Sequence, residues 1–400
     1  MILAPKTDRG SWAVFLIFLR LGLTSFGGPI AHLGYFRDEF VIRRKWLSER
    51  SYADLVALCQ FLPGPASSQV GMALGLFRSG YAGALAAWAG FTLPSAIALI
   101  LFALSIASYD DFLSPGVLLG LKAVALAVVA QAVWGMARNL CPDAPRVTMM
   151  AAAAGFVLLV PSAWAQVGVI VMAGLIGLLL LKPEQIATHD PLPIVMRRRV
   201  GLLFLTIFFA LLIALPCLSI MFPIEALSMV SAFYRAGSLV FGGGHVVLPL
   251  LQTEVVPTGW ISNDVFLVGY GAAQAVPGPL FTFSAFLGAS MSHTPSAWFS
   301  GLIGLLAIFA PSFLLVLGVL PFWAYLRRNS RTQAALLGIN TSVVGILLAA
   351  LYDPMWTSTI HDPQDFGLAL VALVALMFWR LPPWFVVISS GAAGWLFSFY

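Results

Sequence analysis

The sequence predicts an all-α, polytopic membrane protein built from two six-segment halves of inverted topology. Three observations support this: the composition is apolar throughout, about 13 hydrophobic segments follow one another, and two distinct motifs each occur twice. Of the 400 residues, 60% are hydrophobic and 9% are charged, against about 25% charged residues in an ordinary soluble domain. This composition excludes a soluble globular enzyme, a disordered chain and a disulfide scaffold.

Several hydrophobic segments reach the ~20 residues with which an α-helix crosses a bilayer. The first, 12–29, follows Lys6 and Arg9 as in a signal peptide, but no small-residue cleavage site comes after it, so we expect it to stay uncleaved. The segments 147–160 and 366–379 are short and end at proline breaks, which predicts tight hairpins with the segments that follow. The alternation of a membrane β-barrel is not found in the sequence.

An internal repeat organises the chain. The pattern R-x-G-x-x-x-F-G-G occurs at 20–28 and again at 235–243. The pattern Q-x-x-P-G-P follows at 60–65 and again at 274–279. Further matches keep the same order, which indicates duplication: Glu39 with Glu254, Trp46 with Trp260, Ser48 with Ser262, Pro94-Ser95 with Pro311-Ser312, and Leu119-Gly120 with Leu337-Gly338.

The repeat divides the chain into 1–182, a first repeat; 183–225, a cytoplasmic loop and a connecting transmembrane helix; and 226–400, a second repeat. Each repeat has six segments, so a single connecting crossing reverses the second one, as in an inverted-topology repeat. The distribution of basic residues agrees with this inversion. The loop 30–51 carries five basic residues, whereas its counterpart 245–263 carries none.

The side of the loop 30–51 depends on how the first two segments behave. If they re-enter at their glycine and proline breaks, the loop is cytoplasmic, and so is every basic residue except Arg20, Lys122 and Arg235. If both segments cross, the loop is external. The re-entrant version obeys the positive-inside rule, with the N-terminus cytoplasmic and the C-terminus periplasmic.

Glycine and proline breaks within hydrophobic segments predict an anion site. Broken helices are tolerated in a bilayer where they are buried in protein or line a wet cavity, and a helix that restarts there presents N–H groups and a positive dipole end. Inverted repeats bring such breaks together near the midplane. Helix kinks or close-packing points are the alternative. The four breaks are Gly27-Gly28-Pro29, Pro63-Gly64-Pro65, Gly242-Gly243-Gly244 and Pro277-Gly278-Pro279.

Basic residues inside hydrophobic segments strengthen this prediction. Arg20, Lys122 and Arg235 lie there with no acidic residue clearly inside the membrane to neutralise them. A buried charge needs a partner, so an anion is expected, although Lys122 could instead reach an interface. Polar candidates for the same site are Gln60, Gln274, Asn340 (the counterpart of Lys122) and His245, which is either a proton carrier or a packed residue.

Other kinds of chemistry have no signature in the sequence. There is no P-loop, HExxH or G-x-S-x-G motif, and the three cysteines are scattered without a nearby histidine. We therefore expect no enzyme activity, cofactor, metal site or disulfide. The formal net charge of +5 is attributed to the positive-inside rule rather than to nucleic-acid binding.

The motifs resemble those of the chromate ion transporter family in its long, two-domain form. The resemblance rests on FLRLGLTSFGGPIAHL and CQFLPGPASSQ in the first half, and on FGGGH and AAQAVPGPLFT in the second. The repeats differ at one signature position, where Pro29 is matched by Gly244. The resemblance places the first-half signature on Arg20, Gly22, Phe26, Gly27, Gly28, Pro29, Gln60, Pro63, Gly64 and Pro65.

The resemblance implies a secondary transporter that exports chromate across the bacterial inner membrane and confers chromate resistance. Sulfate, a dianion of the same shape, is the expected competitor. The partners expected are chromate and the lipid bilayer, with a homodimer as the alternative to a monomer. Alternative functions are a sulfate or other oxyanion carrier, an anion channel, and an enzyme on lipid-linked phosphates.

Overall fold

The computed structural model describes residues 10–108, 115–183, 196–291 and 296–397, and every regular element within these ranges is a helix. Among them, six helices are long and apolar enough to cross a membrane, and five shorter apolar helices accompany them. The chain is therefore a multi-pass membrane protein. The expected count of about 13 hydrophobic segments is not confirmed, because several expected segments are divided into shorter helices.

The first repeat begins with helices that are too short to cross alone. α1 has 14 residues and rises ~21 Å, short of the ~30 Å hydrocarbon core. α4 consists of two helices that fold back on each other where Ser79 and Gly80 leave helical geometry, since a Cβ at Gly75 would collide with the Gly83 carbonyl. The elements are α1 (Ser11–Thr24), α2 (Gly28–Arg37), η2 (Asp38–Arg43), α3 (Glu49–Phe61), α4 (Ala66–Ser108), α5 (Pro115–Leu140), α6 (Ala144–Leu159) and α7 (Ala163–Leu180), followed by the connecting helix α8 (Arg198–Met221).

The second repeat has the same sequence of long and short helices, with its first segments again divided at the glycine and proline breaks. Its elements are α9 (Glu225–Leu239), η3 (Gly244–Val246), α10 (Val247–Val255), α11 (Asn263–Ala275), η4 (Leu280–Thr282), α12 (Phe283–Ser290), α13 (Ala297–Val319), η5 (Leu320–Phe322), α14 (Trp323–Leu326), α15 (Ser330–Ala350), η6 (Leu351–Trp356), α16 (Thr357–Thr359), α17 (Pro363–Met377) and α18 (Pro383–Phe397).

Matched residues have matched structural roles. Ser48 accepts a hydrogen bond from the Ser51 N–H at the start of α3, and Ser262 accepts one from the Val265 N–H at the start of α11. These N-caps satisfy helix-terminal donors that lipid cannot satisfy. The segment 245–263, expected as an external loop, instead contains the buried helix α10.

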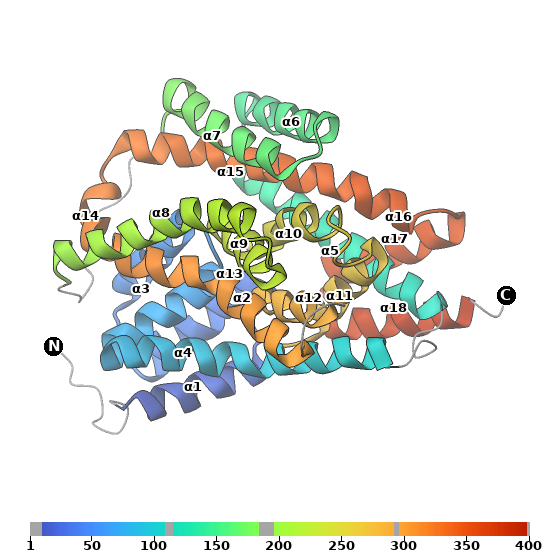
Figure 1. Ribbon diagram of the computed structural model, residues 1–400, viewed down its shortest axis with the longest axis horizontal. Helices are drawn as coiled ribbons and strands as arrows, with labels where there is room; N and C mark the ends of the chain where they lie inside the picture. Colours follow the sequence, from blue (N-terminus) through green and yellow to red (C-terminus); the bar gives the residue numbers. More distant parts are fainter. Residues whose placement is uncertain (1–9, 109–114, 184–195, 292–295, 398–400) are drawn as a thin grey trace.

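Equivalent helices run in opposite directions along the long axis of the molecule. In Figure 1, the part of α4 after Gly80 runs from left to right toward its cyan end, whereas its counterpart α13 runs from the lower middle to the left. The connecting helix α8 packs on α9 and α13, where the Tyr234 hydroxyl donates to the Phe208 carbonyl at 3.0 Å. The opposed directions agree with an inverted repeat.

The last helices of the two repeats are exchanged. α6 and α7 of the first repeat pack on α15 of the second, and α17 and α18 of the second pack on α5 of the first (Figure 1). Glycine permits the closest of these contacts: a Cβ at Gly120 would collide with the Ser390 carbonyl of α18, and one at Gly338 with the Ala173 carbonyl of α7. The last two helices of each repeat therefore cover the long helix of the other repeat, α15 or α5.

Two hydrophobic clusters form most of the core, a larger one with most of its residues in the second repeat and a smaller one with most in the first, and a third lies between α5, α17 and α18. Fully buried aromatic side chains fill both: Phe233, Phe266 and Phe283 in the larger, and Phe18 and Phe36 in the smaller. The breaks described below lie where the two repeats meet.

Replacing Gly338 with alanine should destabilise the exchanged arrangement. The new methyl group would overlap the Ala173 carbonyl and lie 3.0 Å from the Gly177 Cα, and overpacking of this kind costs roughly 1–3 kcal/mol. Gly168→Ala on α7 is the matched control, since nothing lies within 4 Å of a Cβ there. Thermal unfolding of the purified chain in detergent measures both variants. Equal midpoints of thermal unfolding for Gly338→Ala and Gly168→Ala would show that the contact of Gly338 with α7 is not tight.

Candidate functional site

The two Gly-Gly breaks meet where the two repeats contact each other. Gly27, Gly28 and Gly242 have positive φ values of 100°, 76° and 76°, which L side chains rarely adopt. A Cβ built at Gly244 would lie 3.1 Å from the Pro29 Cγ. Pro29 and Gly244 are the one signature position at which the repeats differ, so the smaller residue makes room for the proline across the junction.

Each Pro-Gly-Pro turn binds the Gly-Gly break of the other repeat. The Gly64 N–H donates to the Val240 carbonyl at 2.7 Å, and the Gly278 N–H donates to the Ser25 carbonyl at 2.9 Å. Ser25 and Val240 are repeat-equivalent, and each immediately precedes a Phe-Gly-Gly sequence. Two N–H groups of the Pro-Gly-Pro turns, those of Gly64 and Gly278, are thus satisfied by carbonyls of the opposite repeat. The predicted convergence of the four breaks is found.

Serines from the long helices support the two turns unequally. Ser95 of α4 donates to the Pro277 carbonyl at 2.7 Å, whereas its counterpart Ser312 of α13 is buried and finds no hydrogen-bond partner within the described ranges. The Pro63 carbonyl instead accepts from the Gln69 amide at 2.7 Å. A Cβ at Gly64 would lie 2.6 Å from that amide nitrogen and would also overlap the Ser312 hydroxyl.

Polar side chains gather at the break of the second repeat. His245 Nδ1 lies 2.7 Å from the Tyr270 hydroxyl. The Gln274 amide lies beside the same Tyr270 hydroxyl, and the Asn340 Oδ1 atom is buried with no hydrogen-bond partner among the described residues. The Asn340 Oδ1 would lie 3.7 Å from a Cβ at Gly242. Unsatisfied buried amides are uncommon, and they leave hydrogen-bonding capacity beside the break. Gln60, by contrast, is exposed.

Arg235 is not unpaired, contrary to the sequence-based interpretation. Its guanidinium makes a two-pronged ion pair with Glu254 of α10, in which Nε lies 2.7 Å from Oε1. The guanidinium carbon also lies 5.5 Å from the centre of a ring of Trp164, which belongs to the exchanged helix α7. The interpretation was wrong because Glu254 was assigned to an external loop, whereas its side chain is only 10% exposed.

Lys122 is also paired. Its Nζ lies 2.6 Å from the Asp264 Oδ1 at the start of α11, with side-chain exposures of 13% and 63%. Two of the three cations that the sequence left without partners therefore hold carboxylates in this structure.

Arg20 differs from its counterpart Arg235. It is exposed and has no acidic partner in the described part of the chain. Glu39, the counterpart of Glu254, instead binds Arg44 at 2.6 Å and Arg43 at 3.2 Å. Burial opposes ionisation of Glu39, but the hydrogen bond and charge of Arg44 outweigh it, so the pKa of Glu39 is lowered. Arg20 stays free one turn before α1 ends at the central break.

Two further buried polar groups were given no role by the sequence analysis, which set Asp54 aside because it lies near the end of its hydrophobic segment. Asp54 of α3 is buried and accepts hydrogen bonds from the Arg327 Nη1 at 2.7 Å and the Trp323 Nε1 at 3.1 Å. His32 is buried, with its Nε2 3.2 Å from the Ser25 carbonyl oxygen. The sequence signal available for Asp54 was the presence of an acidic residue within the apolar segment 52–77.

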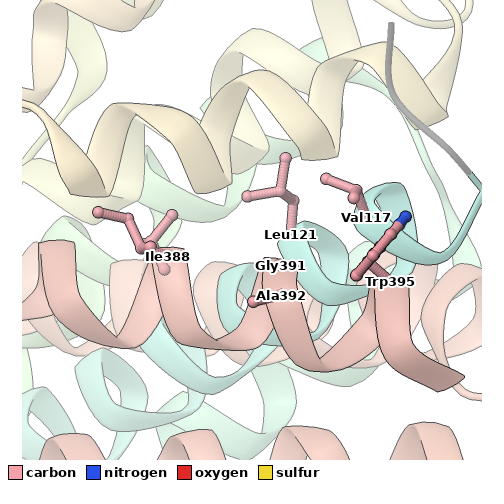
Figure 2. Close-up of a pocket in the computed structure, with 7 residues that line it drawn as sticks. Val117, Leu121, Ile388, Gly391, Ala392 and Trp395 are labelled. Carbon is pink, nitrogen blue, oxygen red and sulfur yellow. The ribbon is translucent and has the colours of Figure 1, made fainter. Parts of the chain in front are cut away.

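An apolar groove lies between α5 and α18, apart from the breaks. Figure 2 shows Leu121 and Val117 of α5 facing Ile388 and Trp395 of α18 across it. Its lining offers almost no polar surface. Such a groove suits an apolar group such as a lipid acyl chain and does not suit a dianion.

Comparisons with known proteins agree with the repeat. The chain is 25% identical to a "Probable chromate transport protein" of Synechococcus elongatus over 95% of this chain and 94% of that protein. It is 27% identical to a "Chromate transport protein" of Pseudomonas aeruginosa over 96% and 91%. An "Uncharacterized transporter YwrA" of Bacillus subtilis is 29% identical over 41% of this chain and 93% of its own length, so it has the size of one repeat.

No solved structure matches the chain significantly. A family model described as "Chromate transporter" matches it twice, at residues 12–178 and 227–395. These two matches cover most of the sequence and both sets of breaks, and the chain therefore belongs to the chromate transporter family.

Proposed function

We propose that the chain exports chromate from the cytoplasm across the bacterial inner membrane, with the dianion bound at the junction of the four breaks. The observation that carries the proposal is the reciprocal pair of backbone hydrogen bonds, Gly64 to Val240 and Gly278 to Ser25. They hold the restarting helix α2 close to the opposite break, where N–H groups and dipole ends favour an anion.

The proposed ligands come from both repeats. The Gln274 amide lies beside the Tyr270 hydroxyl, and His245 and Asn340 lie beside the same break. From the first repeat, Arg20 supplies a cation that no carboxylate occupies. Arg235 and Lys122 contribute positive potential, but because each already holds a carboxylate we assign them no direct contact with the anion.

The membrane potential favours export. A potential that is negative inside drives a dianion outward by about 4.6 kcal/mol per 100 mV. Alternating access by rocking of one repeat against the other delivers the ion to the periplasm. The N-terminus then lies in the cytoplasm and the C-terminus in the periplasm, which puts the basic loop 30–51 on the cytoplasmic side.

Replacing Arg20 with alanine tests the site. We expect Arg20→Ala to lose chromate uptake into everted vesicles and Arg20→Lys to keep part of it, because a lysine retains the charge but not the planar fork. Arg37→Ala, which removes an exposed ion pair with Glu49, is the control with normal uptake. Full uptake by Arg20→Ala at equal protein content would contradict this role.

Sulfate tests the substrate class in the same vesicles. Excess sulfate should slow chromate uptake by the parent chain, since both ions are tetrahedral dianions. If labelled sulfate is transported and chromate is not, the alternative of a sulfate carrier is correct.

A further inference from the structure

Two ion pairs connect the repeats at opposite ends of the molecule. The first joins Asp54 of α3 to Arg327, which follows α14, at 2.7 Å. The second joins Lys122 of α5 to Asp264 of α11 at 2.6 Å. In Figure 1, α3 and α14 lie at the left, whereas α11 and the start of α5 lie toward the right. Each pair therefore spans the boundary between repeats on one side of the breaks.

The two acids occupy related helices. α3 and α11 are repeat-equivalent, and each leads directly into a Pro-Gly-Pro turn. Nine residues separate Asp54 from Pro63 and thirteen separate Asp264 from Pro277, or roughly 13 Å and 20 Å of helix. A movement of either helix against the other repeat therefore acts at once on an ion pair and on the central junction.

The pairs themselves are not repeated. The counterpart of Asp54 is Val268, and the counterpart of Lys122 is Asn340. Structural duplication alone does not explain two unrelated charge pairs at corresponding boundaries. Each end of the molecule has its own ion pair, so the pair at one end can separate while the pair at the other end stays formed.

We propose that these two ion pairs are the gates of transport: Asp54–Arg327, with Trp323, closes the cytoplasmic side, and Lys122–Asp264 closes the periplasmic side. The proposal rests on the proposed transport through the central junction. Both pairs are formed here, so the structure corresponds to an occluded arrangement. An ion entering from the cytoplasm requires the first pair to separate, and its release requires the second to separate.

Burial makes the two gates unequal. The Asp54 and Arg327 side chains are 1% and 11% exposed, whereas Asp264 is 63% exposed. Removing one partner of a buried pair is far more costly than removing one partner of an exposed pair, because it leaves a buried charge without compensation. Loss of one partner should therefore disturb the cytoplasmic gate more than the periplasmic gate.

Sided labelling of a central cysteine tests the gates without any substrate. The reporter is Ala31→Cys, which lies 3.1 Å from a Cβ built at Gly27, in a chain whose Cys59, Cys141 and Cys217 are replaced by alanine. A small, membrane-impermeant thiosulfonate is applied to everted vesicles or to right-side-out vesicles, and the labelling rate is measured.

Asp54→Asn or Arg327→Gln should raise labelling from the cytoplasmic face by at least about ten-fold, the factor that corresponds to 1.4 kcal/mol. Asp264→Asn should raise labelling from the periplasmic face, by a smaller factor. Exchanging the charges, with Asp54→Arg and Arg327→Asp together, should restore slow cytoplasmic labelling. Arg37→Gln, in the exposed pair with Glu49, is the control with unchanged labelling.

The possible outcomes distinguish the proposed gates from the proposed substrate. Unchanged sided labelling in folded Asp54→Asn and Asp264→Asn chains overturns the gates, even if chromate is transported. Failure of the charge exchange to restore slow labelling also counts against them. A sided change in a chain that moves no chromate supports the gates and overturns the proposed substrate.

Discussion

Replacing Gly278 with alanine is expected to lower chromate uptake by at least about ten-fold, the factor that corresponds to 1.4 kcal/mol. Gly278 has φ +102, and a Cβ there would overlap the Ser95 hydroxyl and lie 3.2 Å from the Phe91 carbonyl oxygen. Left-handed geometry alone costs an L residue roughly 1–2 kcal/mol. Relief of the steric overlap or of the backbone strain moves the Gly278 N–H that donates to the Ser25 carbonyl. This movement separates the breaks.

Initial uptake rates in everted vesicles, at matched protein content, measure this effect. Gly64→Ala in the other repeat should behave in the same way, because a Cβ there meets Ser312 and Gln69. Gly259→Ala is the control: it also has a positive φ, of +74, but nothing lies within 4 Å of its Cβ. It should carry the backbone strain without the loss of transport.

A second substitution sharpens the result. Ser95→Ala removes the hydroxyl that a Cβ at Gly278 would strike, although it also removes the hydrogen bond to the Pro277 carbonyl. We expect Gly278→Ala with Ser95→Ala to recover part of the uptake lost in Gly278→Ala alone. If Gly278→Ala transports at the parental rate, the close approach of the two repeats is not required for function.

The repeat and the meeting of the breaks could be predicted because both follow from residue type and order. A Gly-Gly or Pro-Gly-Pro break frees backbone groups that lipid does not satisfy. Matched breaks in inverted repeats have an obvious way to satisfy one another. The backbone hydrogen bonds of Gly64 to Val240 and of Gly278 to Ser25 pair the breaks in this way. Even the single mismatch, Pro29 against Gly244, follows from their contact.

The ion pairs could not be predicted because their partners are set by tertiary packing. Lys122 and Asp264 lie 142 residues apart, and Asp54 and Arg327 lie 273 apart. Arg235 and Glu254 are only 19 residues apart, but seeing them as a pair required knowing that α10 folds back onto α9. The exchange of the last helices is equally invisible, because a duplicated sequence does not specify which repeat each copy packs against.

Removing the Arg235 side chain is expected to destabilise the fold severely. Arg235→Ala leaves the Glu254 carboxylate, only 10% exposed, without its cation, and an uncompensated buried charge of this kind costs about 3–5 kcal/mol. Arg37→Ala, in a pair whose side chains are 48% and 56% exposed, should change stability little, because water screens an exposed pair. Thermal unfolding in detergent compares the two variants.

A double substitution separates the charge pair from the packing around it. Arg235→Met with Glu254→Gln removes both charges and keeps much of the side-chain volume, so it should be considerably more stable than Arg235→Ala. If the double variant also transports chromate, Arg235 acts only to hold α10 against α9. If it folds but no longer transports, the positive charge at Arg235 is itself required, and a direct contact between Arg235 and the anion during the transport cycle becomes the better account.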